Sequence, residues 1–156
     1  MIKKKILCVA CFVMLQLISF ANVDSLKVAF NTSSSAENKM QIAYEIAKKT
    51  VNSMPDTALS YLYKAIKNND EYSQSTDFGI CLNSISVCYF NKQNYDSVIH
   101  NATRSLHIFL VNGDTIESIK ARKNIALAQR NKGNYKLALN SFFEILEFYK
   151  HDSNNV

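Results

Sequence analysis

Three stretches of this chain align with one another under a single fixed shift, the one that carries Ala58 onto Val98 and Val98 onto Ala138. We call this offset the repeat shift. Within each stretch the aligned positions are spaced four, three and one residues apart, which places them on one face of an α-helix. A helical face that recurs at a long, fixed period indicates a stack of repeated units, in which each unit buries its apolar face against its neighbours. The shift superimposes small and apolar residues in four columns: Ala58, Val98 and Ala138; Leu62, Ala102 and Phe142; Ala65, Ser105 and Ile145; and Ile66, Leu106 and Leu146.

The composition favours helices over sheets. A chain of 156 residues suffices for one modest domain, and 47% hydrophobic with 20% charged residues is ordinary for a globular protein. Three glycines and one proline are few, because a sheet-rich fold with many tight turns needs more of both. We therefore predict an all-α fold, an α-solenoid of three antiparallel helix pairs.

The N-terminal segment 1–21 differs in character from the rest. Three lysines at positions 3–5 precede an apolar run over residues 6–18, and Ser19 and Ala21 supply the small residues of a cleavage site. This layout is typical of a secretory signal peptide, and the run is shorter than the roughly 20 residues that span a bilayer. We predict a signal peptide over 1–21 and export to the periplasm or cell envelope. The alternative is an uncleaved N-terminal segment that anchors the chain to the membrane.

Turn and capping residues divide the remaining chain. Ser35 suits the N-cap of a first helix over about 36–52, and Pro55 suits the first position of a second. Asn112 and Gly113 suit a helix end, and residues 131–134 suit a turn. We expect a flexible leader over 22–35, a repeat domain over 36–150 with units at about 36–70, 75–112 and 114–150, and a polar tail over 151–156.

Charge and motifs argue against nucleic-acid binding, metal binding and catalysis. Without the three leader lysines, 18 basic residues become 15 against 13 acidic ones, whereas a nucleic-acid-binding domain carries a strong basic excess on one face. His100 and His107 are seven residues apart with no further ligand one turn away, too few for a metal site. Common nucleophile, phosphate-binding and zinc-protease motifs do not occur. We predict a non-enzymatic protein with no metal and no cofactor that does not bind nucleic acid.

Cys81 and Cys88 are the two cysteines that follow the leader. Seven residues of helix separate them by about 10.5 Å along the axis, which is more than the Cα separation of about 7 Å that a disulfide allows. We predict that both are buried as small apolar residues. The alternative is a disulfide between two chains.

The second and third units resemble the tetratricopeptide repeat. In that family, small residues lie where helices approach closely and large residues fill the space between units. The period of about 40 residues resembles the longer-helix branch of the family, whose usual period is about 34 residues. The resemblance covers roughly 36–150 and is carried by Leu82, Ile85, Ser86, Tyr89, Asn94, Tyr95, Val98, Ala102, Ser105 and Leu106, and by Ile125, Ala126, Gly133, Asn134, Tyr135, Ala138, Phe142, Ile145 and Leu146.

The resemblance implies a concave surface, formed by the first helix of each unit, that binds an extended peptide. Lysine, arginine and asparagine side chains there suit a peptide carboxylate, which they hold by charge-assisted hydrogen bonds. The first unit offers Ala43 and Ala47 at the matching positions, and a solvated basic face is the alternative interpretation. By position, the resemblance assigns to this surface Asn83, Val87, Phe90, Lys120, Lys123, Asn124 and Arg130.

The last predicted helix is apolar over more than one stripe. A large uncovered apolar face marks an interface, so we expect self-association or another partner there. The residues that we assign to this interface are Phe142, Phe143, Leu146 and Tyr149.

Together these patterns predict an exported, non-enzymatic module that binds a protein or peptide partner as a scaffold, adaptor or peptide-binding domain. The alternative is a truncated periplasmic input domain of a membrane-bound bacterial signalling regulator, because such regulators resemble this chain in carrying exported repeats of this spacing. A downstream membrane helix and output domain would favour that alternative.

Overall fold

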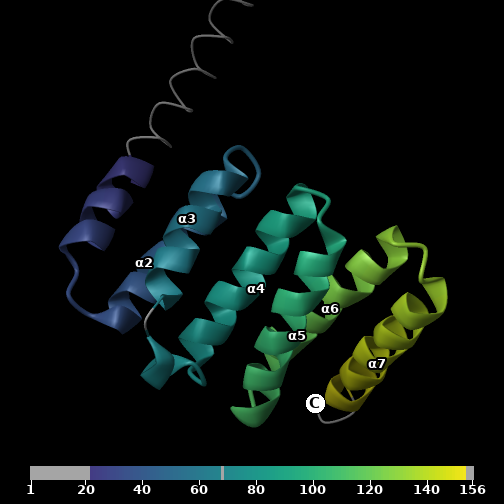
Figure 1. Ribbon diagram of the computed structural model, residues 1–156. Helices are drawn as coiled ribbons and strands as arrows, with labels where there is room; N and C mark the ends of the chain where they lie inside the picture. Colours follow the sequence, from purple (N-terminus) through teal and green to yellow (C-terminus); the bar gives the residue numbers. More distant parts are fainter. Residues whose placement is uncertain (1–21, 68, 154–156) are drawn as a thin grey trace, which may run out of the picture.

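The computed structural model describes residues 22–67 and 69–153, and these form helices without strands (Figure 1). The predicted signal peptide lies outside the described residues, as do the last three residues of the predicted tail. A helical segment over 22–32 comes first, and a short 3-10 turn, η1 (Asp70–Tyr72), follows the third helix. The remaining helices are α2 (Ala36–Thr50), α3 (Pro55–Ile66), α4 (Thr76–Asn91), α5 (Tyr95–Val111), α6 (Thr115–Asn131) and α7 (Tyr135–Ser153).

The six long helices stack as three antiparallel pairs. Each helix packs against the next one along the chain, so the pairs α2–α3, α4–α5 and α6–α7 follow one another in order (Figure 1). The first helices of the pairs also contact one another, α2 with α4 and α4 with α6, and so line one common face. The predicted all-α solenoid of three helix pairs is confirmed.

Capping residues set the helix starts where the sequence predicts them. The side chains of Ser35, Ser75, Asn94 and Asp114 each accept a hydrogen bond from the backbone N–H three residues further on. Pro55 occupies the first turn of α3, where its missing N–H leaves no bond unmade. The helix ends differ slightly from the prediction, because the first helix stops at residue 50 and the last continues to 153.

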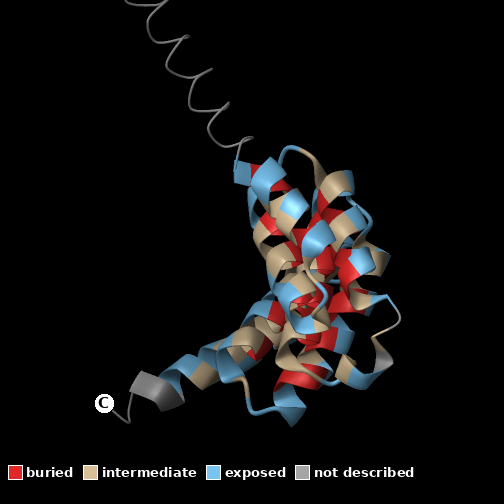
Figure 2. Cartoon of the chain, turned by 90° about the vertical axis from the view of Figure 1, so that its left-hand side faces the viewer, coloured by how far each residue is buried: buried red, intermediate tan, exposed pale blue. Residues whose placement is uncertain are grey.

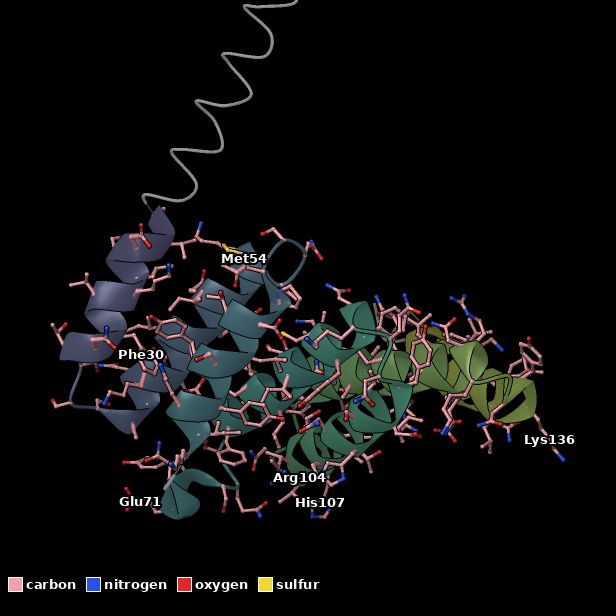
Figure 3. The ribbon with its side chains drawn as sticks, turned by 45° about the horizontal axis from the view of Figure 1, so that its top comes forward. Phe30, Met54, Glu71, Arg104, His107 and Lys136 are labelled. Atoms are coloured by element: carbon pink, nitrogen blue, oxygen red, sulfur yellow. The ribbon has the colours of Figure 1, made fainter. Side chains whose placement is uncertain are left out.

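Two acid–base pairs are related by the repeat shift and join neighbouring units. Lys92, after α4, donates to Asp56 in the first turn of α3 at 2.6 Å. Lys132, after α6, pairs in the same way with Asp96 in the first turn of α5. The repeat shift carries Asp56 onto Asp96 and Asp96 onto Lys136, so the third unit has a positive charge where the first two have a negative one. The Lys136 side chain points outward (Figure 3). We call the two pairs the inter-unit rungs.

Buried side chains concentrate within the first two pairs (Figure 2). Met40, Ile46 and Leu62 are almost fully buried, and so are Cys81 and Cys88, which are unpaired thiols. The prediction that both cysteines are buried is confirmed. Burial raises the pKa of each thiol from 9.0 to about 12, so the thiols stay protonated near neutral pH.

The prediction of a flexible leader over 22–35 is wrong for residues 22–32, which are helical. Val23 and Phe30 are buried, and the Phe30 ring meets the Tyr61 ring of α3 edge-on at 5.1 Å between centroids. Apolar residues at 23, 26 and 30 give this segment a helical face, and burial of that face against the first pair stabilises it. The predicted tail is also partly helical, because α7 continues through 153.

Gly79 allows α4 and α5 to approach closely. A Cβ atom at this position would lie 2.7 Å from Phe109 Cε1 and 3.2 Å from Ile108 Cγ2. Because Phe109 is fully buried, its ring has no free space into which to move.

We expect Gly79→Val to lower the free energy of unfolding by about 1–3 kcal/mol, because it overpacks this contact. Chemical denaturation of Gly79→Val, Phe109→Leu and the double variant measures the effect. The double variant should lose less than the sum of the two single losses, because the smaller leucine makes room for the valine. Additive losses would contradict the close contact.

The turns after α4 and α6 both contain a left-handed residue at the same repeat position. Gln93 has φ 58°, and Gly133, its counterpart under the repeat shift, has φ 82°. A left-handed conformation costs a non-glycine residue about 1–2 kcal/mol, and a glycine at the same position avoids this cost. Glycine is also more flexible in the unfolded chain, and this flexibility cancels about 0.5–1 kcal/mol of the stability gained.

We therefore expect Gln93→Gly to raise the free energy of unfolding by about 0.5–1 kcal/mol. The matched control is the reverse exchange, Gly133→Gln, which should lower it by a similar amount. Urea denaturation of both variants checks the pair. A loss of stability in Gln93→Gly would show that the glutamine side chain stabilises this turn.

Candidate functional site

A groove runs along the face lined by the first helices of the three pairs. One part of it, about 140 Å³, lies between α2 and α4, and a second part, about 240 Å³, continues across α4 to α6. Tyr44, Ser84 and Val87 line both parts. We call the whole the inner groove; its other lining residues are Ala47, Lys48, Val51, Ile80, Asn83, Glu117, Lys120, Lys123 and Asn124.

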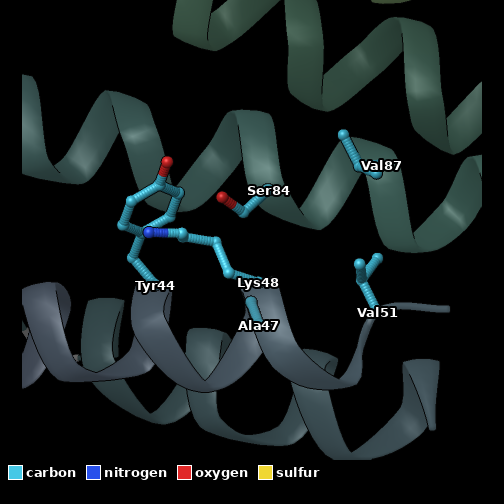
Figure 4. A pocket seen from close by; sticks show the side chains of 6 residues that line it. All are labelled: Tyr44, Ala47, Lys48, Val51, Ser84 and Val87. Atoms are coloured by element: carbon cyan, nitrogen blue, oxygen red, sulfur yellow. The ribbon is translucent and has the colours of Figure 1, made fainter. Parts of the chain in front are cut away.

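The repeat itself positions the groove side chains. Tyr44 on α2, Ser84 on α4 and Asn124 on α6 are related by the repeat shift, and all three line the groove. Tyr44 and Lys48 from α2 face Ser84 and Val87 from α4 across the first part (Figure 4). Equivalent positions on successive stacked helices therefore form one continuous strip.

A polar network joins α4 to α6 at the floor of the groove. The Asn124 amide donates to Asn83 Oδ1 at 2.8 Å and to Ser86 Oγ at 3.3 Å. The Ser86 hydroxyl in turn donates to the Asn83 carbonyl oxygen at 2.6 Å. Asn83 is only 8% exposed, so its first role is to connect the second and third units.

Three lysines border the groove, and two of them are paired within their own helix. Lys48 lies 2.9 Å from Glu45, and its Nζ is 5.2 Å from the centre of the Tyr44 ring. Lys120 pairs with Glu117. A hydrogen bond to its glutamate is the main cause that raises the pKa of each lysine, so both remain charged.

Lys123 is exposed and has no ion-pair partner within the described ranges 22–67 and 69–153. Its side chain is therefore available to an acidic ligand. The α2 and α4 sides of the groove carry apolar side chains such as Val51, Ile80 and Val87. The α6 side is polar, and its lining residues are Glu117, Lys120, Lys123 and Asn124. Such a groove suits an extended chain with alternating apolar and acidic side chains.

Five of the seven predicted peptide-binding residues line the groove: Asn83, Val87, Lys120, Lys123 and Asn124. Phe90 and Arg130 are not lining residues. The Phe90 ring packs edge-on against Tyr95 at 5.7 Å, beside the α4–α5 turn, and Arg130 is exposed in the last turn of α6.

Sequence reasoning missed Tyr44 and Lys48 in the first unit. It assigned Ala43 and Ala47 to the inner face. Ala47 does line the groove, whereas Ala43 is fully buried and is not a lining residue. A shift of one residue turns a side chain by about 100° around a helix. The repeat shift itself, which relates Tyr44 to Ser84 and Asn124, was the signal that identifies the lining column.

The predicted interface residues lie on α7, away from the inner groove. Phe143, Leu146 and Tyr149 are exposed, and Phe142 is half-buried. Phe143 also lines a wider hollow of about 520 Å³ between α6 and α7. Arg122 of α6 forms an ion pair with Glu144 of α7 beside this hollow.

In comparisons with known proteins, no family model matches the chain, and no curated protein or solved structure matches it. Within the described part of the chain, no three His, Cys, Asp or Glu side chains cluster as metal ligands would. None of the described helices combines the length and the apolar character needed to cross a membrane.

We expect Asn124→Ala to lower the free energy of unfolding by about 1 kcal/mol, because it removes the amide that joins α6 to Asn83. A double-mutant cycle with Asn83→Ala should give a coupling energy of about 0.5–1.5 kcal/mol. The control, Asn140→Ala on the exposed side of α7, should change stability by less than about 0.5 kcal/mol. A coupling energy near zero would mean that the two amides do not bind each other in solution.

Proposed function

We propose that this protein is a non-enzymatic interaction module of the tetratricopeptide type, which holds an extended acidic peptide segment in the inner groove. The single observation that carries the proposal is the continuous strip of lining side chains, which recurs with the repeat shift across the first helices of all three pairs. A groove of this kind presents a surface to a partner.

The dimensions of the groove set the length of the ligand. Three packed helices with axes about 8–10 Å apart span about 20 Å. An extended peptide rises about 3.3 Å per residue, so about six residues cross the groove. Apolar ligand side chains would pack on Val87 and Ile80, and a ligand carboxylate would accept a hydrogen bond from Lys123.

The proposal includes export. It rests on the basic start, the apolar run and the small residues of the N-terminal segment 1–21. The partner is then a protein of the periplasm or cell envelope that carries an exposed acidic segment. The inner groove would act in a scaffold or adaptor, because its described residues bring no nucleophile and general base together.

Panning phage-displayed random peptides of about ten residues against the chain tests the proposal, since about six residues fill the groove. We expect selected peptides to combine acidic with apolar residues. Lys123→Glu should weaken their binding by roughly tenfold or more, because a charge-assisted hydrogen bond becomes a repulsion. Fluorescence anisotropy with one labelled peptide measures the change.

Two further variants locate the binding. Ser84→Trp should block the groove, because Ser84 lines both of its parts. Lys136→Glu makes the same charge change as Lys123→Glu on an exposed lysine outside the groove, and should leave binding unchanged. Failure to select any peptide, or equal losses in the two lysine variants, would contradict the proposal.

A further inference from the structure

One side of α7 carries an exposed apolar stripe. Its members are 47–70% exposed and are spaced four, four, three and three residues apart, as on a single helix face. Of the eleven large apolar side chains that are exposed in the described residues, nine lie between 110 and 149. Uncovered apolar area is therefore concentrated at this end of the stack. We call Tyr135, Leu139, Phe143, Leu146 and Tyr149 the α7 stripe.

The residues of α5 that match the α7 stripe under the repeat shift show how far such a face is buried inside the stack. The counterpart of Tyr149 under the repeat shift is Phe109, which is fully buried. The residues that match Tyr135, Leu139 and Leu146 are half-buried, and the one that matches Phe143, Thr103, is exposed. The Phe109 ring packs on Gly79 of α4, and α5 also contacts α6. Among the described helices, α7 has extensive contacts with α6 alone. The α7 stripe therefore has the form of a face that packs against another helix.

The opposite end of the stack is already closed. The helical segment 22–32 covers the first pair and buries Val23 and Phe30 there (Figure 3). A second copy of the chain therefore has no open face at its first pair to offer, and head-to-tail stacking would need that segment displaced. The face that a second copy does offer is its own α7 stripe.

We propose that two copies of the chain associate through their α7 stripes, as an isologous dimer with antiparallel α7 helices. In the antiparallel arrangement the helix dipoles oppose each other, and Leu139 of one copy meets Leu146 of the other. Lys136, near the start of one α7, then lies near the Glu147–Lys150 ion pair at the end of the other, so it faces no isolated like charge. A parallel arrangement would instead place Lys136 of one copy beside Lys136 of the other, which is repulsive.

The size of this face fits a weak dimer. A helix of 19 residues is about 28 Å long. Two such helices in contact bury on the order of 1,000 Å² in total, at the lower limit for a specific interface. We therefore expect a dissociation constant in the micromolar range. The inner groove lies on other residues, so the dimer leaves both grooves open, and the proposal does not depend on the proposed function.

Light scattering after size-exclusion chromatography, over about 1–200 µM chain, tests the dimer across the micromolar range. The intact chain should shift from monomer to dimer. Leu146→Glu should weaken dimerisation by tenfold or more, because it buries a charge in the stripe. The matched control is Leu137→Glu, since Leu137 is 53% exposed on the same helix but outside the stripe.

Residues 1–21 are the same in all three chains, so association through them would not distinguish the variants. A chain that stays monomeric throughout, or equal losses in Leu146→Glu and Leu137→Glu, would overturn the proposal. Circular dichroism of each variant shows whether it is folded. The crosslinking experiment below is a second test, and its cysteine substitutions introduce no charge.

Disulfide crosslinking tests the orientation. Leu139→Cys and Leu146→Cys chains, mixed and oxidised, should form a crosslinked dimer more readily than either chain alone, because an antiparallel pair brings 139 beside 146. Cys8 and Cys11 are replaced by serine in every chain, and the native Cys81 and Cys88 thiols are buried, so none of the four native cysteines competes. Crosslinks of each variant with itself would overturn the antiparallel arrangement, and no crosslink in any mixture would overturn the dimer.

Discussion

Close contact between helices at small buried residues is the interaction on which the rest of the structure depends. Ala58 and Ala138 are almost fully buried at matching places in the first and third units, and Gly79 lets α4 meet the Phe109 ring of α5. A larger side chain at any of these places would push two helix axes apart. Because the inner groove is formed by three neighbouring helices, such a shift would also change the distances between its lining residues.

Much of the fold could be predicted from the sequence because local and long-range signals agree. Capping side chains such as Ser35 and Ser75 mark helix starts through local hydrogen bonds, and the repeat shift marks which faces are buried. The helical segment 22–32 was missed because it is short and adjoins a polar run. Its helical state depends on tertiary contacts such as Phe30 with Tyr61, which no local pattern states.

The candidate site was less accessible to sequence reasoning. Position within the repeat identified the second and third units' contributions, such as Val87 and Lys123, because a helix face keeps its orientation from unit to unit. It did not show that Glu117 neutralises Lys120, since that depends on the side-chain rotamers. Nor did it show that Asn83 and Asn124 are joined to each other, because a hydrogen bond is fixed by the packing distance between helices.

The inter-unit rungs give the stack a direction, because the acid always lies in the earlier unit and the base in the later one. This direction determines which further units can be inserted. The first and second units each present an acid at the start of the second helix, and this acid pairs with a base from the turn of the following unit. A duplicate of the segment 74–113, inserted directly after the original, would keep every rung, because Lys92 of the duplicate would meet Asp96 of the original. A unit added beyond α7 would need a carboxylate at the turn position that Lys92 and Lys132 occupy, because its partner in the third unit, Lys136, is positively charged.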